Sequence, residues 1–314
     1  MADCKRAPVG RQDGKVPRWR LEKAVVGLRG RVQFDVPLRT YTSFRVGGPA
    51  DVLVEPADLN DLVRVVKQAA EQKVRIFVLG GTNLLVRDKG IRGIVIRLAR
   101  LRAIKEEAES VLYAEAGVGM PTLMGYAIRR SLKGLEWAAG IPGTVGGCVV
   151  MNAGTKLGEM KDVVKAVRMV TPTGAVKEYD GRSITFEYRR AKLPPGVVAG
   201  VWLQLAPGVR RELEKTVKDY LRYRRQTQPL TLPSAGCVFK NPPHDLAGRV
   251  VEAAGLKGAR VGDAEVSIKH ANFIVNRGHA TAQDVLALIR KVRHEVFQKT
   301  GVKLELELQL VGQA

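Results

Sequence analysis

Residues 140–147 of the chain have the sequence GIPGTVGG, and Asn152-Ala153-Gly154 follows shortly after. Five glycines and one proline therefore lie within fifteen residues, and the residues around them are apolar rather than linker-like. Such a composition argues against a regular helix or strand, so we predict an irregular segment over 134–158. An apolar, glycine-rich segment of a globular chain usually passes close to another backbone or to a large ligand.

A glycine pair lies earlier in the chain, where Gly80-Gly81-Thr82-Asn83 follows the apolar run 74–79. Glycine lets a backbone approach a ligand, and consecutive N–H groups of such a loop can form an anion-binding nest. The loop is neither a P-loop nor a GxGxxG nicotinamide fingerprint, since the sequence contains neither motif. The two loops together favour a ring-bearing dinucleotide, such as a flavin dinucleotide; close packing is the alternative.

Around these loops, strand-like and helix-like segments alternate. Asp58 is a helix N-cap candidate. The apolar positions of the helix after it are Leu59, Leu62, Val63, Val66 and Ala70. Pro121 begins another helix, and a third starts at Thr281, with Asp284 three residues later, and ends at Gly301. Further helices are predicted at 210–225 and 247–254, and strands at 51–54, 74–79, 94–98, 111–116, 164–170, 201–205, 273–275 and 304–310.

The length and composition limit the class of protein. A chain of 314 residues is expected to form two or three domains, since domains usually run to ~100–200 residues. A hydrophobic content of 45% excludes a disordered chain. No apolar run approaches the ~18–20 residues of a membrane span, and the basic N-terminus lacks the apolar region of a secretory signal.

The charge is strongly positive, with 52 Lys and Arg against 31 Asp and Glu, a formal net charge of +21. Such a balance is typical of nucleic-acid binders, and it also suits an enzyme with phosphate-bearing ligands. Residues 1–31 alone carry nine basic and three acidic side chains. We interpret residues 1–30 as a solvated, partly disordered tail, with an anion-binding arm as the alternative.

Three segments hold side chains that could take part in chemistry. Arg189 lies in a Tyr-Arg-Arg run, for which a solvated surface is the favoured interpretation. Cys237 follows Ala-Gly and precedes an apolar pair, which suggests a side chain held on a tight turn; a buried thiol is the alternative. Glu307 alternates with leucines in the last predicted strand, where a surface carboxylate is the plain interpretation. Cys4, Cys148 and Cys237 lie far apart, which argues against disulfides or zinc and fits a reducing, cytoplasmic setting.

Several segments, taken in their order along the chain, resemble those of one family, the UDP-N-acetylenolpyruvoylglucosamine reductases. The resemblance covers essentially residues 31–312. It rests on YTSFRVGGPA (41–50), VLGGTNLLV (78–86), GIPGTVGG (140–147), MNAG (151–154), FEYR (186–189), SAGCVFKNP (234–242), HANFIVN (270–276) and the terminal strand. Each run is weak alone, whereas the order and spacing of the set are highly specific.

The resemblance implies an α+β fold of three domains. Two form an FAD-binding unit of the vanillyl-alcohol oxidase type, and the third is an α+β substrate domain. The implied boundaries are 31–100 for FAD-binding domain 1 with a return strand at 305–314, 101–208 for FAD-binding domain 2 and 209–304 for the substrate domain. The short gap between Arg189 and Cys237 resembles the branch of the family without a Tyr-bearing insertion.

The resemblance also implies a reaction. NADPH reduces FAD, and flavin N5 then gives a hydride to the enolpyruvyl ether of UDP-N-acetylglucosamine. The product is UDP-N-acetylmuramate, a precursor of peptidoglycan. The implied role is therefore in cell-wall synthesis, and through it in cell shape and cell division. Arg189 and Glu307 match the residues that stabilise the enolate. Cys237 matches the proton donor, which is usually a serine; a thiol is a stronger acid than a hydroxyl.

The binding residues implied by the resemblance form two sets. Those for FAD are Arg45, Gly80, Gly81, Thr82, Asn83, Leu84, Gly117, Gly140, Ile141, Pro142, Thr144, Val145, Gly146, Gly147, Asn152 and Gly154. Those for the UDP-sugar are Arg225, Lys240, Asn241 and His270.

We therefore expect a cytoplasmic monomer that binds FAD, NADPH and the UDP-sugar, with no metal, nucleic acid or membrane span. Another FAD-dependent oxidoreductase of the same fold is the enzyme-class alternative. A basic nucleic-acid-binding protein has little support, because the sequence shows no recognised nucleic-acid motif and no basic stripe with interleaved aromatic residues.

Overall fold

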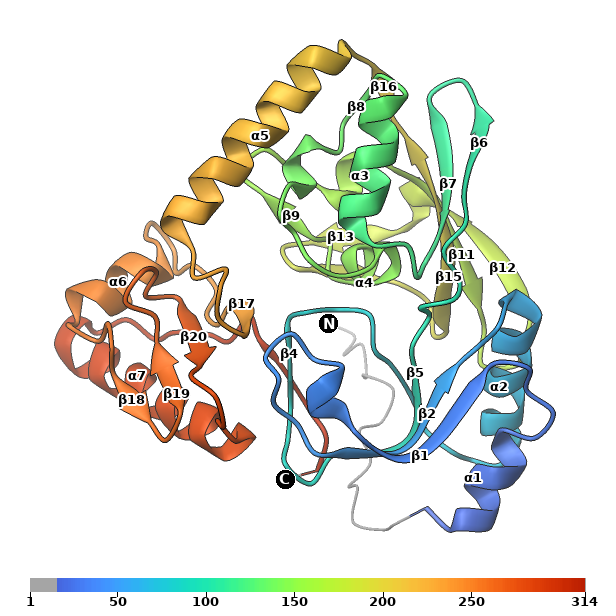
Figure 1. The fold of residues 1–314 in the computed structure, drawn as a ribbon, viewed down its shortest axis with the longest axis horizontal. Coiled ribbons are helices and arrows are strands. Elements are labelled where there is room, and N and C mark those ends of the chain that lie inside the picture. The colour runs from blue at the N-terminus through green and yellow to red at the C-terminus, as the bar shows by residue number, and fades with distance from the viewer. Residues whose placement is uncertain (1–15, 314) are drawn as a thin grey trace, which may run out of the picture. The chain divides into compact units, whose positions relative to one another are not determined.

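The computed structural model describes residues 16–313, whose helices and strands are labelled in Figure 1. The chain divides into two compact units. Unit 1 comprises the described residues to Asp35, Ala50–Gly80 and Arg92–Arg210, and unit 2 comprises Val36–Pro49, Gly81–Ile91 and the residues from Arg211 on. Both units contain helices and sheets, which confirms the α+β fold class, whereas the three sets of domain boundaries stay a prediction. Within residues 16–313, no helix is long and apolar enough to cross a membrane.

The first sheet of unit 1 has the strand order β1-β2-β5-β3. Its strands are β1 (Arg31–Pro37), β2 (Pro49–Glu55), β5 (Ile91–Ile96) and β3 (Ile76–Val78). Between β2 and β3 runs helix α2 (Leu59–Glu71), and the Asp58 carboxylate caps it by accepting a hydrogen bond from the N–H of Asp61 at 2.9 Å. The predicted cap is confirmed.

The buried face of α2 differs from the prediction. Leu62 and Val66 are buried as expected, but Val65 and Ala69 join them in place of Leu59, Val63 and Ala70. The fifth buried residue is Asp61, which is 2% exposed. The prediction missed this rotation because it used apolar spacing alone, whereas the carboxylate of Asp61 has backbone partners that hold it inside.

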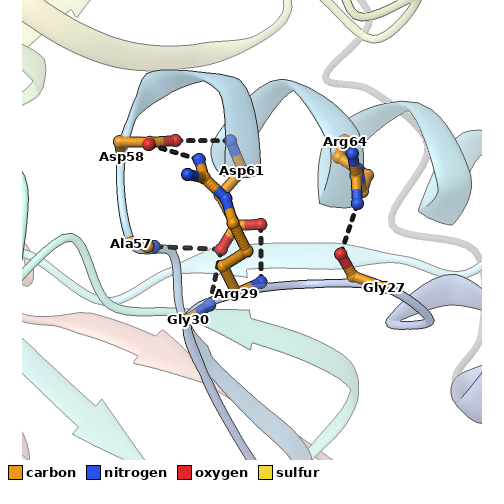
Figure 2. Close-up of polar contacts among 7 residues, drawn as sticks. All are labelled: Gly27, Arg29, Gly30, Ala57, Asp58, Asp61 and Arg64. Atoms are coloured by element: carbon orange, nitrogen blue, oxygen red, sulfur yellow. Dashed lines mark hydrogen bonds and ion pairs between the residues drawn. The ribbon is translucent and has the colours of Figure 1, made fainter.

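Those partners belong to the N-terminal segment and to the turn before α2. The Asp61 carboxylate accepts hydrogen bonds from the N–H groups of Arg29 (3.0 Å), Gly30 (2.8 Å) and Ala57 (3.0 Å), as Figure 2 shows. Burial alone would favour the neutral acid, but these three bonds outweigh it and hold the pKa of Asp61 below its usual value. Arg64 also donates to the carbonyl of Gly27. We call the contacts of Asp61 with residues 29, 30 and 57 the Asp61 clamp.

The clamp follows a helix that the sequence did not predict, α1 (Arg18–Ala24). Leu21 and Ala24 are buried, and α1 lies beside α2 (Figure 1). The prediction of a partly disordered tail is therefore wrong for residues 16–30. Its remaining part, residues 1–15, lies outside the described residues.

The second sheet of unit 1 is antiparallel, with the order β12-β11-β15-β7-β6. These strands are β12 (Val176–Asp180), β11 (Val164–Val170), β15 (Val197–Gln204), β7 (Val111–Glu115) and β6 (Ile104–Ala108). The helix predicted from Pro121 is α3 (Met120–Arg129), with the proline in its first turn. Short two-stranded pairs are β8 (Leu132–Lys133) with β16 (Ala206–Pro207), β9 (Gly154–Thr155) with β10 (Gly158–Glu159), and β13 (Thr185–Glu187) with β14 (Arg190–Lys192).

The glycine-rich segment contains a helix, α4 (Val145–Val150), so the expectation of an entirely irregular segment over 134–158 is wrong. Thr144 caps this helix, its side chain accepting from the N–H of Gly147 at 3.4 Å. Two glycines of α4 follow each other at 146 and 147. Tertiary contacts of this short helix outweigh the low helix propensity of glycine.

Unit 2 has a sheet with the order β17-β20-β19-β18. Its strands are β17 (Ser234–Cys237), β20 (Phe273–Asn276), β19 (Ala264–Val266) and β18 (Arg260–Val261), and its helices are α5 (Arg210–Thr227), α6 (Ala247–Ala253) and α7 (Ala282–Thr300). The predicted capping box of Thr281 and Asp284 is present, and Gly301 ends α7 with a φ of 71°. The last predicted strand is shorter than expected: β21 (Gln309–Val311) pairs in parallel with β4 (Leu84–Val86).

Replacing Asp61 should release the N-terminal segment. In Asp61→Asn the amide keeps the size of the carboxyl but has one acceptor oxygen in place of two, so a backbone N–H loses its partner at a cost of about 2 kcal/mol. We expect amide hydrogen exchange at residues 29 and 30 to accelerate by roughly thirtyfold.

The pH dependence of amide exchange at residues 29 and 30 provides a control for this prediction. Because the pKa of Asp61 is lowered in the folded state, its contribution to stability is present above the unfolded pKa and is lost as the pH falls through the folded pKa. The acid-induced increase in exchange should therefore be present in the wild type and absent from Asp61→Asn. Asp35→Asn, whose carboxyl side chain is 78% exposed, should leave exchange unchanged; an equal effect there would contradict the role of the clamp.

Candidate active site

The predicted site residues fall into two sets, one in each unit. Unit 1 holds Gly80, Gly117, Gly140, Ile141, Pro142, Thr144, Val145, Gly146, Gly147, Asn152, Gly154 and Arg189. Unit 2 holds Arg45, Gly81, Thr82, Asn83, Leu84, Arg225, Cys237, Lys240, Asn241, His270 and Glu307.

In unit 1 the two glycine-rich loops meet. The carbonyl of Gly80 accepts hydrogen bonds from the N–H (3.2 Å) and the hydroxyl (3.1 Å) of Thr144. A Cβ on Gly80 would lie 3.0 Å from that hydroxyl oxygen, so a larger residue would press on the contact. Gly140 and Gly143, with φ of 73° and 104°, turn the chain in front of α4. Thr144 thus joins the first loop to the start of α4.

Two glycines of the predicted cofactor set are required by packing. A Cβ on Gly117 would lie 1.7 Å from the carbonyl oxygen of Leu98. A Cβ on Gly146 would lie 2.8 Å from the Cβ of Ala116, whose carbonyl accepts the N–H of Gly146 at 2.9 Å. For these two positions the packing alternative explains the glycine. Gly154 is similar, since its Cβ would lie 2.4 Å from that of Glu159.

Arg189 lies at the tip of a β-hairpin. Strands β13 and β14 pair Glu187 with Arg190, so Tyr188 and Arg189 form a two-residue turn, and Arg189 adopts a φ of 58°. Its guanidinium carbon lies 4.9 Å from the centre of the Tyr188 ring. The hairpin is also bridged by an ion pair between Lys192 and Glu187. The turn therefore holds Arg189 on a short, paired ribbon.

Asn152 ties this hairpin to the glycine-rich segment. It is 1% exposed, and its Nδ2 donates to the carboxylate of Glu159 (2.8 Å) and to the carbonyl of Glu187 (3.1 Å). Its Oδ1 accepts from the N–H of Lys161 at 3.0 Å. A residue predicted to bind the cofactor thus has its side chain engaged in holding the strand that precedes Arg189.

In unit 2, Cys237 ends β17 on an irregular stretch of strand. Ser234 pairs with Val275 and Cys237 with Phe273, with a register shift between them at which Gly236 adopts a φ of 77°. The side chains on either side of the glycine and thiol, Ala235 and Val238, are buried, whereas Cys237 is half-buried. The predicted tight turn is therefore a strand with a register shift, and the thiol that it carries is not fully buried.

The residues after Cys237 are fixed by an asparagine that the sequence analysis did not select. Asn272 is 3% exposed; its Oδ1 accepts from the N–H of Phe239 (2.9 Å) and its Nδ2 donates to the carbonyl of Phe239 (2.8 Å). Its own carbonyl accepts the N–H of Val238 at 2.9 Å. The available signal was a polar residue inside the apolar run HANFIVN, but its partner lies 33 residues away.

Glu307 and Asn83 contact the same region. The N–H of Glu307 donates to the carbonyl of Val238 (2.9 Å), and the carbonyl of Glu307 accepts from Nδ2 of Asn83 (2.8 Å). The N–H of Gln309 in turn donates to the carbonyl of Asn83 at 3.1 Å. The structure thereby brings the loop at 81–84, the residue after Cys237 and the backbone of Glu307 together within unit 2.

One atom of this group stands out. The Oδ1 of Asn83 is buried, and within residues 16–313 it has no hydrogen-bond partner. A buried carbonyl oxygen is normally satisfied, so this position suits an N–H or O–H group of a ligand. Next to it, a Cβ on Gly81 would have no described atom within 4 Å, so that glycine is not explained by packing.

The remaining residues of this loop contact the segment that precedes Arg45. The hydroxyl of Ser43 donates to the carbonyl of Thr82 at 2.9 Å, and Leu84 begins β4 opposite Gln309. Arg45 is exposed between buried Phe44 and Val46 and adopts a φ of 54°.

The four predicted substrate residues have various protein contacts. Lys240 pairs with Glu305 (3.2 Å), and Oδ1 of Asn241 accepts the N–H of Ala247 at the start of α6 (3.0 Å). Burial lowers the pKa of His270, whose Nδ1 accepts the N–H of Asn272 at 3.2 Å. Arg225 is exposed, and its carbonyl accepts from Lys269. These contacts leave the proposed ligand roles open.

Other reactive groups are few in the described residues. Cys148 is buried in α4, and burial raises the pKa of its thiol to about 12, so it stays neutral. Between residues 16 and 313, no cluster of His, Cys, Asp or Glu is arranged to hold a metal ion.

Comparison with known families divides the chain into two matched regions. Residues 50–180 match the family described as FAD binding domain. Residues 228–311 match the C-terminal domain of UDP-N-acetylenolpyruvoylglucosamine reductase.

Individual relatives agree with these matches. The chain is 46% identical to UDP-N-acetylenolpyruvoylglucosamine reductase 2 of Symbiobacterium thermophilum, over 92% of this chain and 95% of the relative. It is 49% identical to the reductase of Anaeromyxobacter sp. strain Fw109-5, over 91% and 90%. The crystal structure of the reductase from Thermus caldophilus superimposes with a TM-score of 0.79 at 39% identity, covering 91% of this chain and 100% of that one.

Substitution can distinguish a glycine that packing requires from one that packing does not explain. Gly117→Ala places a methyl group against a backbone carbonyl, so it should destabilise the protein by about 3 kcal/mol or more. Gly81→Ala has open space and an ordinary φ, so it should change stability by no more than about 1 kcal/mol. Urea unfolding followed by circular dichroism measures both; similar midpoints would contradict the assignment.

Proposed function

The chain belongs to the UDP-N-acetylenolpyruvoylglucosamine reductase family, and on that premise we propose that it reduces the enolpyruvyl ether of UDP-N-acetylglucosamine with electrons from NADPH. The product would be UDP-N-acetylmuramate, a precursor of peptidoglycan. The likeness over nine-tenths of the chain to reductases of this name carries the proposal. We further propose that the protein works as a cytoplasmic monomer on small-molecule substrates, and not on nucleic acid.

The residues of the glycine-rich loops suit FAD. FAD offers hydroxyl groups and a ring N–H, and the unsatisfied Oδ1 of Asn83 is an acceptor for such a donor. Gly81 leaves open space for a ligand beside it. We propose that these two residues, with Arg45, Thr82 and Leu84, are the cofactor-binding residues of unit 2, and that the segment 140–147 supplies those of unit 1. Bound FAD supplies the hydride chemistry that no side chain can provide.

Cys237 is the proposed proton donor. Its thiol is half-buried at the end of β17, and the residues that follow it are held by the paired hydrogen bonds of Asn272. A donor fixed in this way needs little reorganisation to give its proton to the substrate carbon. The thiol also replaces the serine that the family usually has, and a reducing cytoplasm would keep it from oxidation.

Arg189 is proposed to balance the negative charge that develops on the substrate. A guanidinium pairs well with a carboxylate and is always charged, so it suits an enolate that spreads into the carboxylate. The hairpin and the buried side chain of Asn152 support this role by restricting the turn that carries Arg189.

Glu307 is proposed to assist the same intermediate through a shared proton. Its backbone is hydrogen-bonded to Val238, the residue after Cys237, and to Asn83. A carboxyl group helps an anion only when it carries a proton. These backbone contacts support a position of Glu307 near Cys237, from which it would stabilise the enolate while Cys237 delivers the proton.

Substitution of Cys237 tests the donor role. In Cys237→Ala, reduction of the flavin by NADPH should proceed as in the wild type, whereas reduction of the UDP-sugar should slow by roughly 10²–10⁴-fold, because no acid is placed at the carbon. Cys237→Ser keeps a donor and should remain active. Stopped-flow absorbance separates the two half-reactions, and unchanged rates for both in Cys237→Ala would exclude the role.

The function as a whole is tested anaerobically. The purified protein should be yellow and release FAD; after reduction by NADPH, the enolpyruvyl UDP-sugar should reoxidise the flavin. Gly81→Ala, which should fold normally, is expected to bind FAD less tightly. A colourless protein, or a reduced flavin that the UDP-sugar leaves unchanged, would overturn the proposal, and the second result would favour another flavin oxidoreductase.

A further inference from the structure

An aromatic and basic surface lies on the exposed side of α1 and on the turn that follows it. We define the α1 outer face as Trp19, Arg20, Lys23 and Val26. Trp19 is 51% exposed and Val26 is 62% exposed. Trp19 and Lys23 are one helical turn apart and share one side of α1, and Val26 lies in the turn after the helix. Leu21 and Ala24 are buried on the other side.

Two cations lie over the exposed indole. The guanidinium carbon of Arg20 is 5.2 Å and the Nζ of Lys23 is 5.1 Å from the centre of the Trp19 ring. The neighbouring Arg18 is different, because it pairs with Glu22 (3.1 Å) and Asp35 (3.2 Å). The outer face therefore combines a large apolar ring, an aliphatic side chain and positive charge.

The outer face is held in place by hydrogen bonds to α2. The Asp61 clamp fixes residues 29 and 30, and the carbonyls of Val26 and Gly27 accept hydrogen bonds from Gln68 (3.2 Å) and Arg64 of α2. The exposure of Trp19 is thus a property of a docked helix. The proposed reaction uses none of these residues.

We propose that the α1 outer face docks on an anionic phospholipid surface. Residues 16–31 carry five basic side chains and one acidic side chain, and the charges of Lys and Arg persist throughout the physiological pH range. Indole rings partition into the bilayer interface, and each nearby cation strengthens binding to anionic lipid by roughly fivefold. One apolar anchor and several charges together give reversible attachment without a membrane span.

A bilayer fits the outer face better than single-stranded nucleic acid does. Nucleic-acid grooves stack successive bases on several aromatic rings, whereas the outer face has the single ring of Trp19 with two cations already over it. Exposed Val26 adds apolar area, which a phosphate backbone does not use and a bilayer interface does.

Vesicle binding tests the proposal with the full-length, flavin-loaded protein. Vesicles of equal parts phosphatidylcholine and phosphatidylglycerol should sediment the protein, and vesicles of phosphatidylcholine alone should not. The double variant Arg20→Gln with Lys23→Gln should bind the anionic vesicles roughly twenty-five-fold more weakly. In the wild type the vesicles should shift tryptophan emission to the blue, and Trp19→Phe should lose this shift. Of the other two tryptophans, Trp137 is 3% exposed, and Trp202 is half-buried with its ring centre 4.7 Å from that of Tyr113.

A matched pair elsewhere serves as control. Phe297 is 43% exposed on α7, with the Nζ of Lys303 5.7 Å from the centre of its ring, so Phe297→Ala with Lys303→Gln removes an aromatic–cation pair outside the outer face. This variant should bind vesicles like the wild type; equal losses in both variants, or no difference between the two vesicle types, would overturn the proposal. Binding to labelled oligothymidylate in the absence of vesicle binding would also overturn it and would assign the surface to nucleic acid.

Discussion

Close contact between backbones determines how the centre of unit 1 is built. A Cβ on Gly117, which follows β7, would collide with the carbonyl oxygen of Leu98, and a Cβ on Gly146 in α4 would collide with the Cβ of Ala116. Because these contacts are satisfied by hydrogen bonds, the short helix α4 can start beside Gly80 and carry Thr144 to it. The position of the glycine-rich segment therefore depends on glycines that have no Cβ. Gly81 is different, because a Cβ there would have no described atom within 4 Å, which leaves space for a ligand.

Much of this fold could be predicted from local patterns. The helices that begin at Asp58 and Thr281 have their caps one turn before an apolar stripe, and both were located correctly. Three features could not be predicted, because distant partners decide them. The helix α1 gains its stability from α2, the short helix α4 overrides glycine propensity through packing, and Asp61 turns α2 towards backbone N–H groups about thirty residues earlier.

The candidate site likewise combines features that local sequence patterns predict with features that depend on distant partners. The order of motifs identified the family, and it predicts the reactive residues, among them the thiol at Cys237, whose role is a proposal. Spacing could not show that Asn272 holds the residues after Cys237, or that Asn152 supports the hairpin of Arg189, since buried amides are recognised only by their partners. Both asparagines have satisfied amide nitrogens and low exposure, so they stabilise the neighbouring backbone at the positions where chemistry is proposed.

The parallel pairing of β4 with β21 joins segments that are more than two hundred residues apart, since Asn83 contacts Glu307 across 224 positions. A ribosome delivers β4 long before β21. Residues 81–91 leave the ribosome without their partner strand and must wait until residues 309–311 have emerged. The core of unit 1 lies in residues that precede Arg211, so unit 1 can assemble while unit 2 is incomplete. The pairing beside the loop of Asn83 therefore forms late, and a chain that ends before residue 309 lacks this pairing.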